Sequence, residues 1–195
     1  MVERIIEDLS RFLYEIPAIL LAISIHEYSH AIVARRLGDD TASEMRLLNL
    51  NPLPRIDLVG FLMFLWFRYG WAKDIPVDFR KLGSSRWKPF AVIAAGVAGN
   101  FLLSVFFIFL LMLKKPVPES YFFNFIGYSI VLNFNLVLIN FLPVLPLDGG
   151  KVVRLFWPDY ERYVFPGVLF VILLSLTGFS KWIQHLSSTI FGWFI

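Results

Sequence analysis

Cysteine is absent from the 195 residues, and both histidine and charged residues are scarce. The lack of cysteine excludes disulfides, iron–sulfur clusters and a thiol nucleophile, so a metal ion would have to be bound by His, Asp or Glu. Charged residues make up 17% of the chain, whereas an average soluble domain has about a quarter. The net charge is only +3, so we expect no nucleic-acid partner.

Apolar residues, by contrast, make up 57% of the sequence, and the mean hydropathy is +0.67. A soluble protein with this composition would lack the polar surface needed to cover its core, which indicates an integral membrane protein. The length suits one domain and not two, so residues 1–195 are expected to form a single polytopic domain.

Four long apolar stretches predict membrane-spanning helices. Residues 16–34 would extend about 28 Å as a helix, close to the thickness of a bilayer core. Residues 89–113 and 120–147 carry no charge, and residues 163–180 form a shorter span. The tail, residues 182–195, is expected either to lie at the membrane interface or to complete a final crossing.

The segment between residues 41 and 70 has a different pattern. Residues 41–50 alternate loosely between polar and apolar side chains, which predicts a small strand or hairpin. Residues 58–67 are apolar but too few to cross a bilayer, which favours a re-entrant segment. The predicted fold is therefore an all-α membrane bundle of about four to six transmembrane segments, with a small strand or hairpin and a re-entrant segment between residues 41 and 70.

Lys and Arg predict the orientation, because positively charged loops tend to stay in the cytoplasm. Ten of the eighteen basic residues lie between residues 35 and 88, and Lys151, Arg154 and Arg162 add three. Both regions are therefore expected inside, with the N-terminus outside.

His26, Glu27 and His30 form a His-Glu-x-x-His motif within the first predicted span. Imidazoles at positions i and i+4 share one helix face, about 6 Å apart along the axis, so both can bind one metal ion. Glu27 is placed to take a proton from a metal-bound water. In a soluble sequence such spacing often arises by chance, but ionisable groups inside a span are costly and mostly serve a function. We predict one Zn²⁺ per chain at this motif.

Zinc bound by two histidines needs a third protein ligand and an open position for water. Asp148 is the best candidate, because it follows a long uncharged run and comes shortly after Pro146. The prolines end the helix, and Gly149 and Gly150 permit a sharp turn that aims the carboxylate into the bundle. The alternative for Asp148 is a helix-terminal or interfacial carboxylate held by Lys151.

Four further residues predict close contacts between helices. Gly96 and Gly99 permit a close helix approach, and Asn100 is expected to form an interhelical hydrogen bond. Asn133 is more typical of a hydrogen bond to a neighbouring helix than of a substrate contact.

Taken together, these motifs resemble the site-2 protease family of intramembrane zinc metalloproteases, especially its compact prokaryotic members without appended domains. The resemblance covers residues 20–155. It rests on His26 to His30, on Asn140 to Gly150, and on landmarks between them that follow the family's order: Gly38-Asp39-Asp40-Thr41-Ala42, Asn51-Pro52-Leu53, Gly70-Trp71-Ala72-Lys73 and Ala95-Gly96-Val97-Ala98-Gly99-Asn100.

The resemblance implies that His26, His30 and Asp148 bind zinc and that Glu27 is the general base. It also implies that Asn140 holds the substrate backbone or the developing oxyanion. A multi-pass protein of a prokaryotic cell membrane is expected, with its active site toward the cytoplasm.

The expected function is that of a metalloendopeptidase that hydrolyses peptide bonds in or beside the transmembrane segments of membrane-protein substrates, a step in regulated intramembrane proteolysis. Its expected partners are those transmembrane segments and the lipid bilayer. The alternative is a divalent-cation or proton-coupled transporter using the same His/Glu/Asp cluster, which would need a continuous polar path. A third hypothesis is an inactive relative that binds membrane proteins, although such relatives usually lack the glutamate or a ligand.

Overall fold

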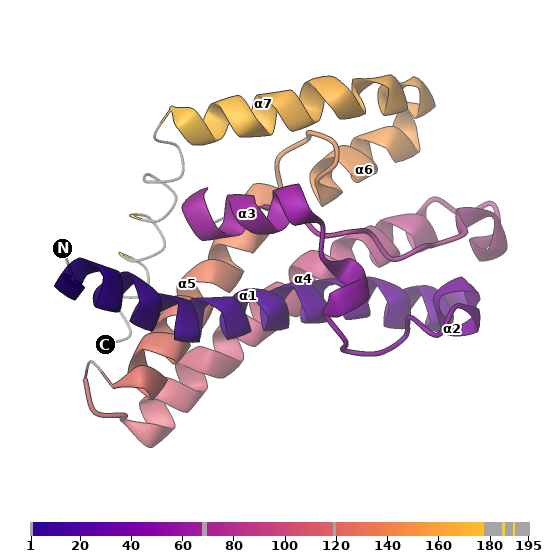
Figure 1. The fold of residues 1–195 in the computed structure, drawn as a ribbon. Coiled ribbons are helices and arrows are strands. Elements are labelled where there is room, and N and C mark those ends of the chain that lie inside the picture. The colour runs from indigo at the N-terminus through magenta and orange to yellow at the C-terminus, as the bar shows by residue number, and fades with distance from the viewer. Residues whose placement is uncertain (1, 68–69, 119, 178–184, 186–188, 190–195) are drawn as a thin grey trace.

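The computed structural model describes residues 2–67, 70–118, 120–177, 185 and 189, and the regular structure of these residues is entirely helical (Figure 1). In chain order the elements are α1 (Val2–Leu37), α2 (Thr41–Glu44), the 3-10 turn η1 (Leu53–Arg55), α3 (Leu58–Phe67), η2 (Phe79–Leu82), α4 (Trp87–Lys114), α5 (Tyr121–Asn140), α6 (Asp148–Phe156), η3 (Pro158–Tyr163) and α7 (Val164–Leu176).

Among the described residues, α1, α4 and α5 are long and apolar enough to cross a membrane. They pack on one another pairwise, and Figure 1 shows them crossing in the lower part of the view. The spans predicted at residues 16–34, 89–113 and 120–147 fall on these helices. Helix α5 ends at Asn140, earlier than predicted, because the prolines that follow cannot continue a helix. The prediction of an all-α integral membrane bundle is confirmed.

Small and polar side chains allow the three long helices to pack closely. Ala18 and Ala22 of α1 are buried one turn apart and belong to the same apolar cluster as Leu132 of α5. The Asn100 side chain of α4 donates to Asn133 Oδ1 of α5 (2.7 Å) and to the backbone oxygen of Ala22 (3.2 Å). The prediction of interhelical bonds at both asparagines is therefore confirmed.

The small strand or hairpin predicted between residues 41 and 50 is wrong, because the described residues contain no strand. Short polar side chains satisfy the backbone N–H groups of this segment locally and leave no ladder to pair. Asp39 Oδ1 accepts from the Thr41 N–H (3.0 Å), and Asn49 Oδ1 accepts from the Asn51 N–H (2.8 Å). Helix α2 and a series of turns stand in place of the hairpin.

Helix α3 has the bounds predicted for the re-entrant segment, Leu58–Phe67. Its ten residues extend about 15 Å, which is too short for a crossing. Phe64 packs into the apolar cluster of α1 and α5. At Gly60 a Cβ atom would lie 2.0 Å from the backbone oxygen of Trp71, so the glycine allows the segment after α3 to press against the helix.

Helices α6 and α7 lie together on one side of the bundle, α7 along the top of Figure 1 with α6 beneath it. Helix α7 begins close to the start of the predicted span 163–180 and is described as far as Leu176. At Gly167 a Cβ would lie 2.0 Å from the Leu145 backbone oxygen, so α7 packs directly on the loop before α6. Except for His185 and Thr189, the predicted tail at residues 182–195 lies outside the described residues.

Candidate active site

The His-Glu-x-x-His motif lies in the interior of the bundle, on a turn of α1 that faces α4. Glu27 is 2% exposed and His30 is 6% exposed. The two imidazoles converge, with 3.1 Å between His26 Nε2 and His30 Nε2. The predicted i, i+4 geometry is therefore present, and both rings point one nitrogen at the same small space.

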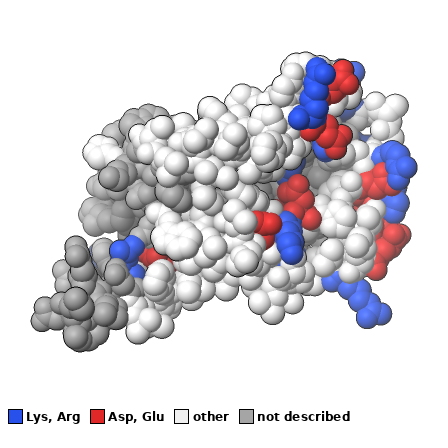
Figure 2. Space-filling view, turned by 45° about the horizontal axis from the view of Figure 1, so that its top comes forward, with Lys and Arg blue, Asp and Glu red and all other residues white. Residues whose placement is uncertain are grey.

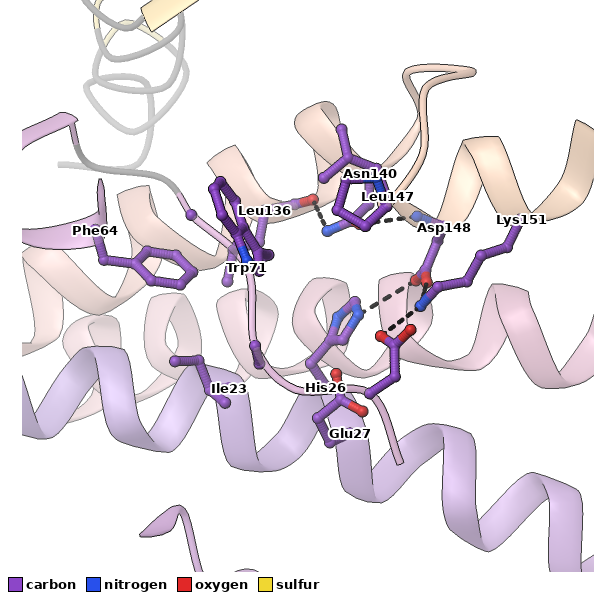
Figure 3. A pocket seen from close by; sticks show the side chains of 14 residues that line it. Ile23, His26, Glu27, Phe64, Trp71, Leu136, Asn140, Leu147, Asp148 and Lys151 are labelled. Carbon is purple, nitrogen blue, oxygen red and sulfur yellow. Dashed lines mark hydrogen bonds and ion pairs between the residues drawn. The ribbon is translucent and has the colours of Figure 1, made fainter. Parts of the chain in front are cut away.

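Asp148 reaches this space from the first turn of α6, as Figure 3 shows. Its Oδ2 atom lies 3.2 Å from His26 Nε2 and 3.3 Å from His30 Nε2. Asn140, the last residue of α5, positions the aspartate, because Asn140 Oδ1 accepts from the Asp148 N–H (3.2 Å). The Asn140 amide group in turn donates to the Leu136 backbone oxygen (3.0 Å).

The contacts of the two Nδ1 atoms show which nitrogen of each ring carries the proton and which one directs a lone pair into the space between the rings. His30 Nδ1 lies 2.8 Å from the Val92 backbone oxygen, which can only accept, so Nδ1 carries the proton. His26 Nδ1 lies 2.5 Å from Asn100 Oδ1, and the Asn100 NH₂ group is already donating elsewhere. In the neutral rings, both Nε2 atoms therefore direct lone pairs at the Asp148 carboxylate.

Three acceptor atoms that face one another repel, and a cation bound between them would remove that repulsion. Asp148 Oδ2 is fully buried and has no hydrogen-bond donor among the described residues. In a tetrahedral zinc site with bonds of about 2.0–2.1 Å, neighbouring ligand atoms lie about 3.3–3.4 Å apart, close to the distances found here. Two imidazoles and one carboxylate are also a donor set found in zinc hydrolases. The residues present therefore fit a zinc ion.

Glu27 lies beside this cluster, with a carboxylate oxygen within 4.8 Å of the ligand atoms of both histidines. The Asp148 oxygen is closer to both rings, so Asp148 and not Glu27 completes the tight triangle. Glu27 Oε2 accepts from the Ile75 N–H (2.9 Å), which orients the carboxylate. Ile75 belongs to the non-helical segment 70–78, which crosses the site between α3 and η2.

Glycines make the close packing around the cluster possible. A Cβ on Gly96 of α4 would lie 2.3 Å from His30 Nε2, and one on Gly99 would lie 2.2 Å from Ser29 Oγ, which confirms the close approach predicted for both. The glycines after Asp148 differ from expectation. They do not form a sharp turn but lie in the first turn of α6, where a Cβ on Gly149 would lie 2.3 Å from the Leu142 backbone oxygen.

Two cavities open beside the cluster, of about 120 Å³ and about 290 Å³. Glu27 lines both, together with Asp74, Pro146 and Lys151. The smaller cavity also contains His26, Asn140 and Asp148, whereas the larger one contains His30. Figure 2 shows most charged side chains gathered at one end of the molecule, around a hollow, while much of the remaining described surface is uncharged.

Several residues near the cluster were missed or only partly anticipated by sequence reasoning. Lys151 Nζ lies 3.1 Å from Asp148 Oδ1 and 2.8 Å from Asp74 Oδ1. Burial opposes the positive charge, but the carboxylates of Asp148 and Asp74 outweigh it and hold the pKa of the Lys151 amine above its ordinary value. The sequence named Lys151 as a possible partner of Asp148, and the structure shows that contact, whereas no signal in the sequence pointed to Asp74.

Arg55 is a second unanticipated residue, since it is a buried cation held by backbone carbonyls. Its guanidinium donates to the oxygens of Ser24 and Leu47, each at 3.0 Å, and also to the Asn49 oxygen. These bonds attach the 47–55 loop to α1 one turn before Glu27. A lone arginine in a polar loop gives no signal of this role in the sequence.

A helical membrane bundle that encloses two histidines, a carboxylate and an adjacent glutamate is typical of membrane-embedded metal-dependent hydrolases. Comparison with known proteins identifies the family. Residues 114–176 match Peptidase family M50. The chain belongs to this family, because it is also 34% identical to a relative named as a zinc metalloprotease over most of the length of both proteins.

Two similar proteins carry the name "Putative zinc metalloprotease". YwhC of Bacillus subtilis (strain 168) is 34% identical over 167 residues, which cover 82% of this chain and 73% of YwhC. Rip2 of Mycolicibacterium smegmatis is 27% identical over 186 residues, which cover 90% of this chain and 71% of Rip2. No solved structure matches the chain significantly.

Proposed function

We propose that the chain is an intramembrane zinc metalloprotease in which His26, His30 and Asp148 bind the metal ion. The observation that carries the proposal is the triangle of ligand atoms, 3.1–3.3 Å on each side, inside a membrane bundle. Membership of Peptidase family M50 supports the reaction class, and the names of YwhC and Rip2 support zinc. Neither comparison supports the transporter alternative.

Zinc held by two imidazoles and a carboxylate supplies a Lewis acid that polarises a peptide carbonyl and makes water more acidic. Glu27 acts as the general base that takes a proton from the attacking water and passes it to the leaving amine. The Ile75 N–H holds one Glu27 oxygen, so the carboxylate has a defined direction beside both cavities. The Nδ1 hydrogen bonds of the histidines orient both imidazoles, and the hydrogen bond from the Asp148 N–H to Asn140 Oδ1 orients the carboxylate.

The substrates proposed are peptide bonds in or beside transmembrane segments. Within a bilayer a helical substrate keeps its carbonyls hydrogen-bonded, so the segment must unwind locally before a carbonyl can reach the cluster. Asn140 lines the smaller cavity, and only one of its two amide N–H groups is used in the hydrogen bond to the Leu136 backbone oxygen. The second N–H is proposed to bind a substrate carbonyl or the developing oxyanion.

The active site is proposed to open toward the cytoplasm of a prokaryotic cell. His30 lies about 7.5 Å along α1 from Arg35, and the basic residues between 35 and 88 favour the cytoplasmic side. The organisms of the two relatives support a prokaryotic source.

Glu27→Gln is the direct test of the mechanism. Glutamine keeps the size of the side chain but cannot accept a proton, so the variant is expected to bind one zinc and to lose nearly all cleavage of a membrane-embedded reporter. Zinc content and cleavage are to be measured in the same preparations. A Glu27→Gln variant that cleaves near the wild-type rate would rule out this general base.

Asp148→Asn and the double variant His26→Ala/His30→Ala test the ligands. A neutral amide is a poorer ligand than a carboxylate, so Asp148→Asn is expected to weaken zinc binding as well as activity. The double histidine variant is expected to lose zinc altogether. Full zinc content in the double variant would refute the site.

A further inference from the structure

The two oxygens of the Asp148 carboxylate have separate partners. Oδ2 faces His26 Nε2 and His30 Nε2 at 3.2 and 3.3 Å, while Oδ1 lies 3.1 Å from Lys151 Nζ. A carboxylate can bind a metal ion through one oxygen or through both. With an ammonium on Oδ1, only Oδ2 is offered to the space between the histidines.

Lys151 is itself held in place. Its side chain is 15% exposed, and its amine also binds Asp74 Oδ1 at 2.8 Å. Asp74 directly precedes Ile75, whose N–H binds Glu27 Oε2 at 2.9 Å. A single lysine therefore joins the helix that carries Asp148 to the segment that orients Glu27.

We propose that Lys151 is a positioning residue that limits Asp148 to one metal-binding oxygen and keeps this ligand in register with Glu27. The proposal rests on the zinc protease function proposed above. When a metal ion is bound, one oxygen from Asp148 would leave the site four-coordinate, with two imidazoles, that oxygen and one open position for water. Binding through both oxygens would fill that position and make the metal a weaker acid.

Cobalt(II) in place of zinc tests the proposal, because four-coordinate cobalt absorbs visible light more strongly than five-coordinate cobalt. The full-length protein in detergent is compared as wild type, Lys151→Met and Lys151→Arg. Lys151→Met is expected to bind one cobalt with reduced visible absorbance, and its zinc form to lose about 10–100-fold in reporter cleavage. Lys151→Arg keeps a cation on Oδ1 and is expected to restore most of both signals.

A charge-neutral double variant separates positioning from simple charge balance. Lys151→Met/Asp74→Asn removes one positive and one negative charge, so it would recover the wild-type spectrum and activity if Lys151 only balanced Asp74. The proposal predicts no recovery, because Asp148 Oδ1 is still uncovered. If Lys151→Met does not fold, Lys151→Ala takes its place, because it also leaves Oδ1 without a cation. It is expected to show the same reduced cobalt absorbance, and wild-type absorbance in Lys151→Ala would overturn the proposal.

Wild-type absorbance and cleavage in Lys151→Met would overturn the proposal. This failure is distinguishable from failure of the proposed function, which would appear in the wild type as absent metal binding or absent cleavage.

Discussion

The histidine side and the aspartate side of the cluster are held by different kinds of structure. His26 and His30 project from one continuous helix, and their outer nitrogens contact Asn100 and the Val92 backbone, both on α4. Asp148 instead follows a loop and depends on Asn140 and Lys151. The histidine side is therefore positioned by the packing of two membrane helices, whereas the aspartate side is positioned by a hydrogen bond to the last residue of α5 and an ion pair within the short helix α6.

This difference indicates where each side tolerates change. Helix packing has little space to yield, so an added atom between α1 and α4 should disrupt both histidines at once. On the aspartate side the end of α5 and the short helix α6 can relax, so the loss of one polar contact there should reduce activity without abolishing metal binding. The predictions below test this contrast, from the largest expected effect to the smallest.

Gly96→Ala is expected to have the largest effect. The new Cβ would lie 2.3 Å from His30 Nε2 and 2.7 Å from His26 Cε1, and the hydrogen bonds of the rings restrict their retreat. We expect loss of most zinc and most cleavage, together with about 1–3 kcal/mol of stability from overpacking. Zinc analysis and thermal unfolding in detergent measure both.

Gly99→Ala is the matched control, because its Cβ would meet Ser29 Oγ and neither histidine. It is expected to lose stability but to keep one zinc per chain. Full zinc content in Gly96→Ala would show that the histidine side is less rigid than its packing indicates.

Asn100→Leu is expected to have the next largest effect. It removes the acceptor of His26 Nδ1 while leaving all three proposed ligands in the chain. Loss of a hydrogen bond to a metal-binding histidine typically costs about 10–100-fold in metal affinity or activity. Competition with a zinc chelator measures the affinity. Asn133→Leu breaks the bond to Asn100 without touching His26, so it should retain higher zinc affinity.

Asn140→Ala probes the aspartate side, where we expect a smaller loss of zinc affinity than in Asn100→Leu. The substitution removes the acceptor for the Asp148 N–H, a bond of the kind worth about 0.5–2 kcal/mol at a helix start. If Asn140 also binds substrate, cleavage should fall further than zinc affinity does. Equal losses of affinity and cleavage would limit Asn140 to positioning Asp148.

Cysteine labelling tests how the chain, and with it the cluster, is oriented in the membrane. The cysteine substitutions are expected to leave activity unchanged. The chain has no cysteine, so single substitutions can be labelled selectively. Ser84→Cys should react from the cytoplasmic side and Val117→Cys from the opposite side. Val117 is preferred to Ser120, whose hydroxyl accepts from the Phe123 N–H at the start of α5. Labelling of both positions from one side would contradict the predicted topology.

Much of the fold was predictable because the signals are local. Long uncharged stretches indicated α4 and α5, and ten apolar residues indicated α3 with its observed bounds. The predicted strand failed because loose alternation over residues 41–50 competes with side-chain hydrogen bonds from Asp39 and Asn49, which favour turns.

The candidate site divides in the same way. Sequence reasoning selected His26, Glu27 and His30 from one helical turn, and Asp148 from its place after an uncharged run. It did not predict the contact between Asn100 and His26 or the ion pair between Asp74 and Lys151. These pairs lie 74 and 77 residues apart, and no periodicity connects positions so distant in the chain.

The sequence by itself determined that this protein lies in a lipid bilayer, and it determined the residue types available for its chemistry. Hydropathy places the chain in a bilayer, and helical spacing places two imidazoles on one face, because both depend only on neighbouring residues. The tertiary structure alone decided which Asp148 oxygen faces the histidines, which nitrogens of the rings are held, and how Lys151 joins Asp148 to Asp74. Such choices depend on distances between separate segments, which only the packed bundle defines.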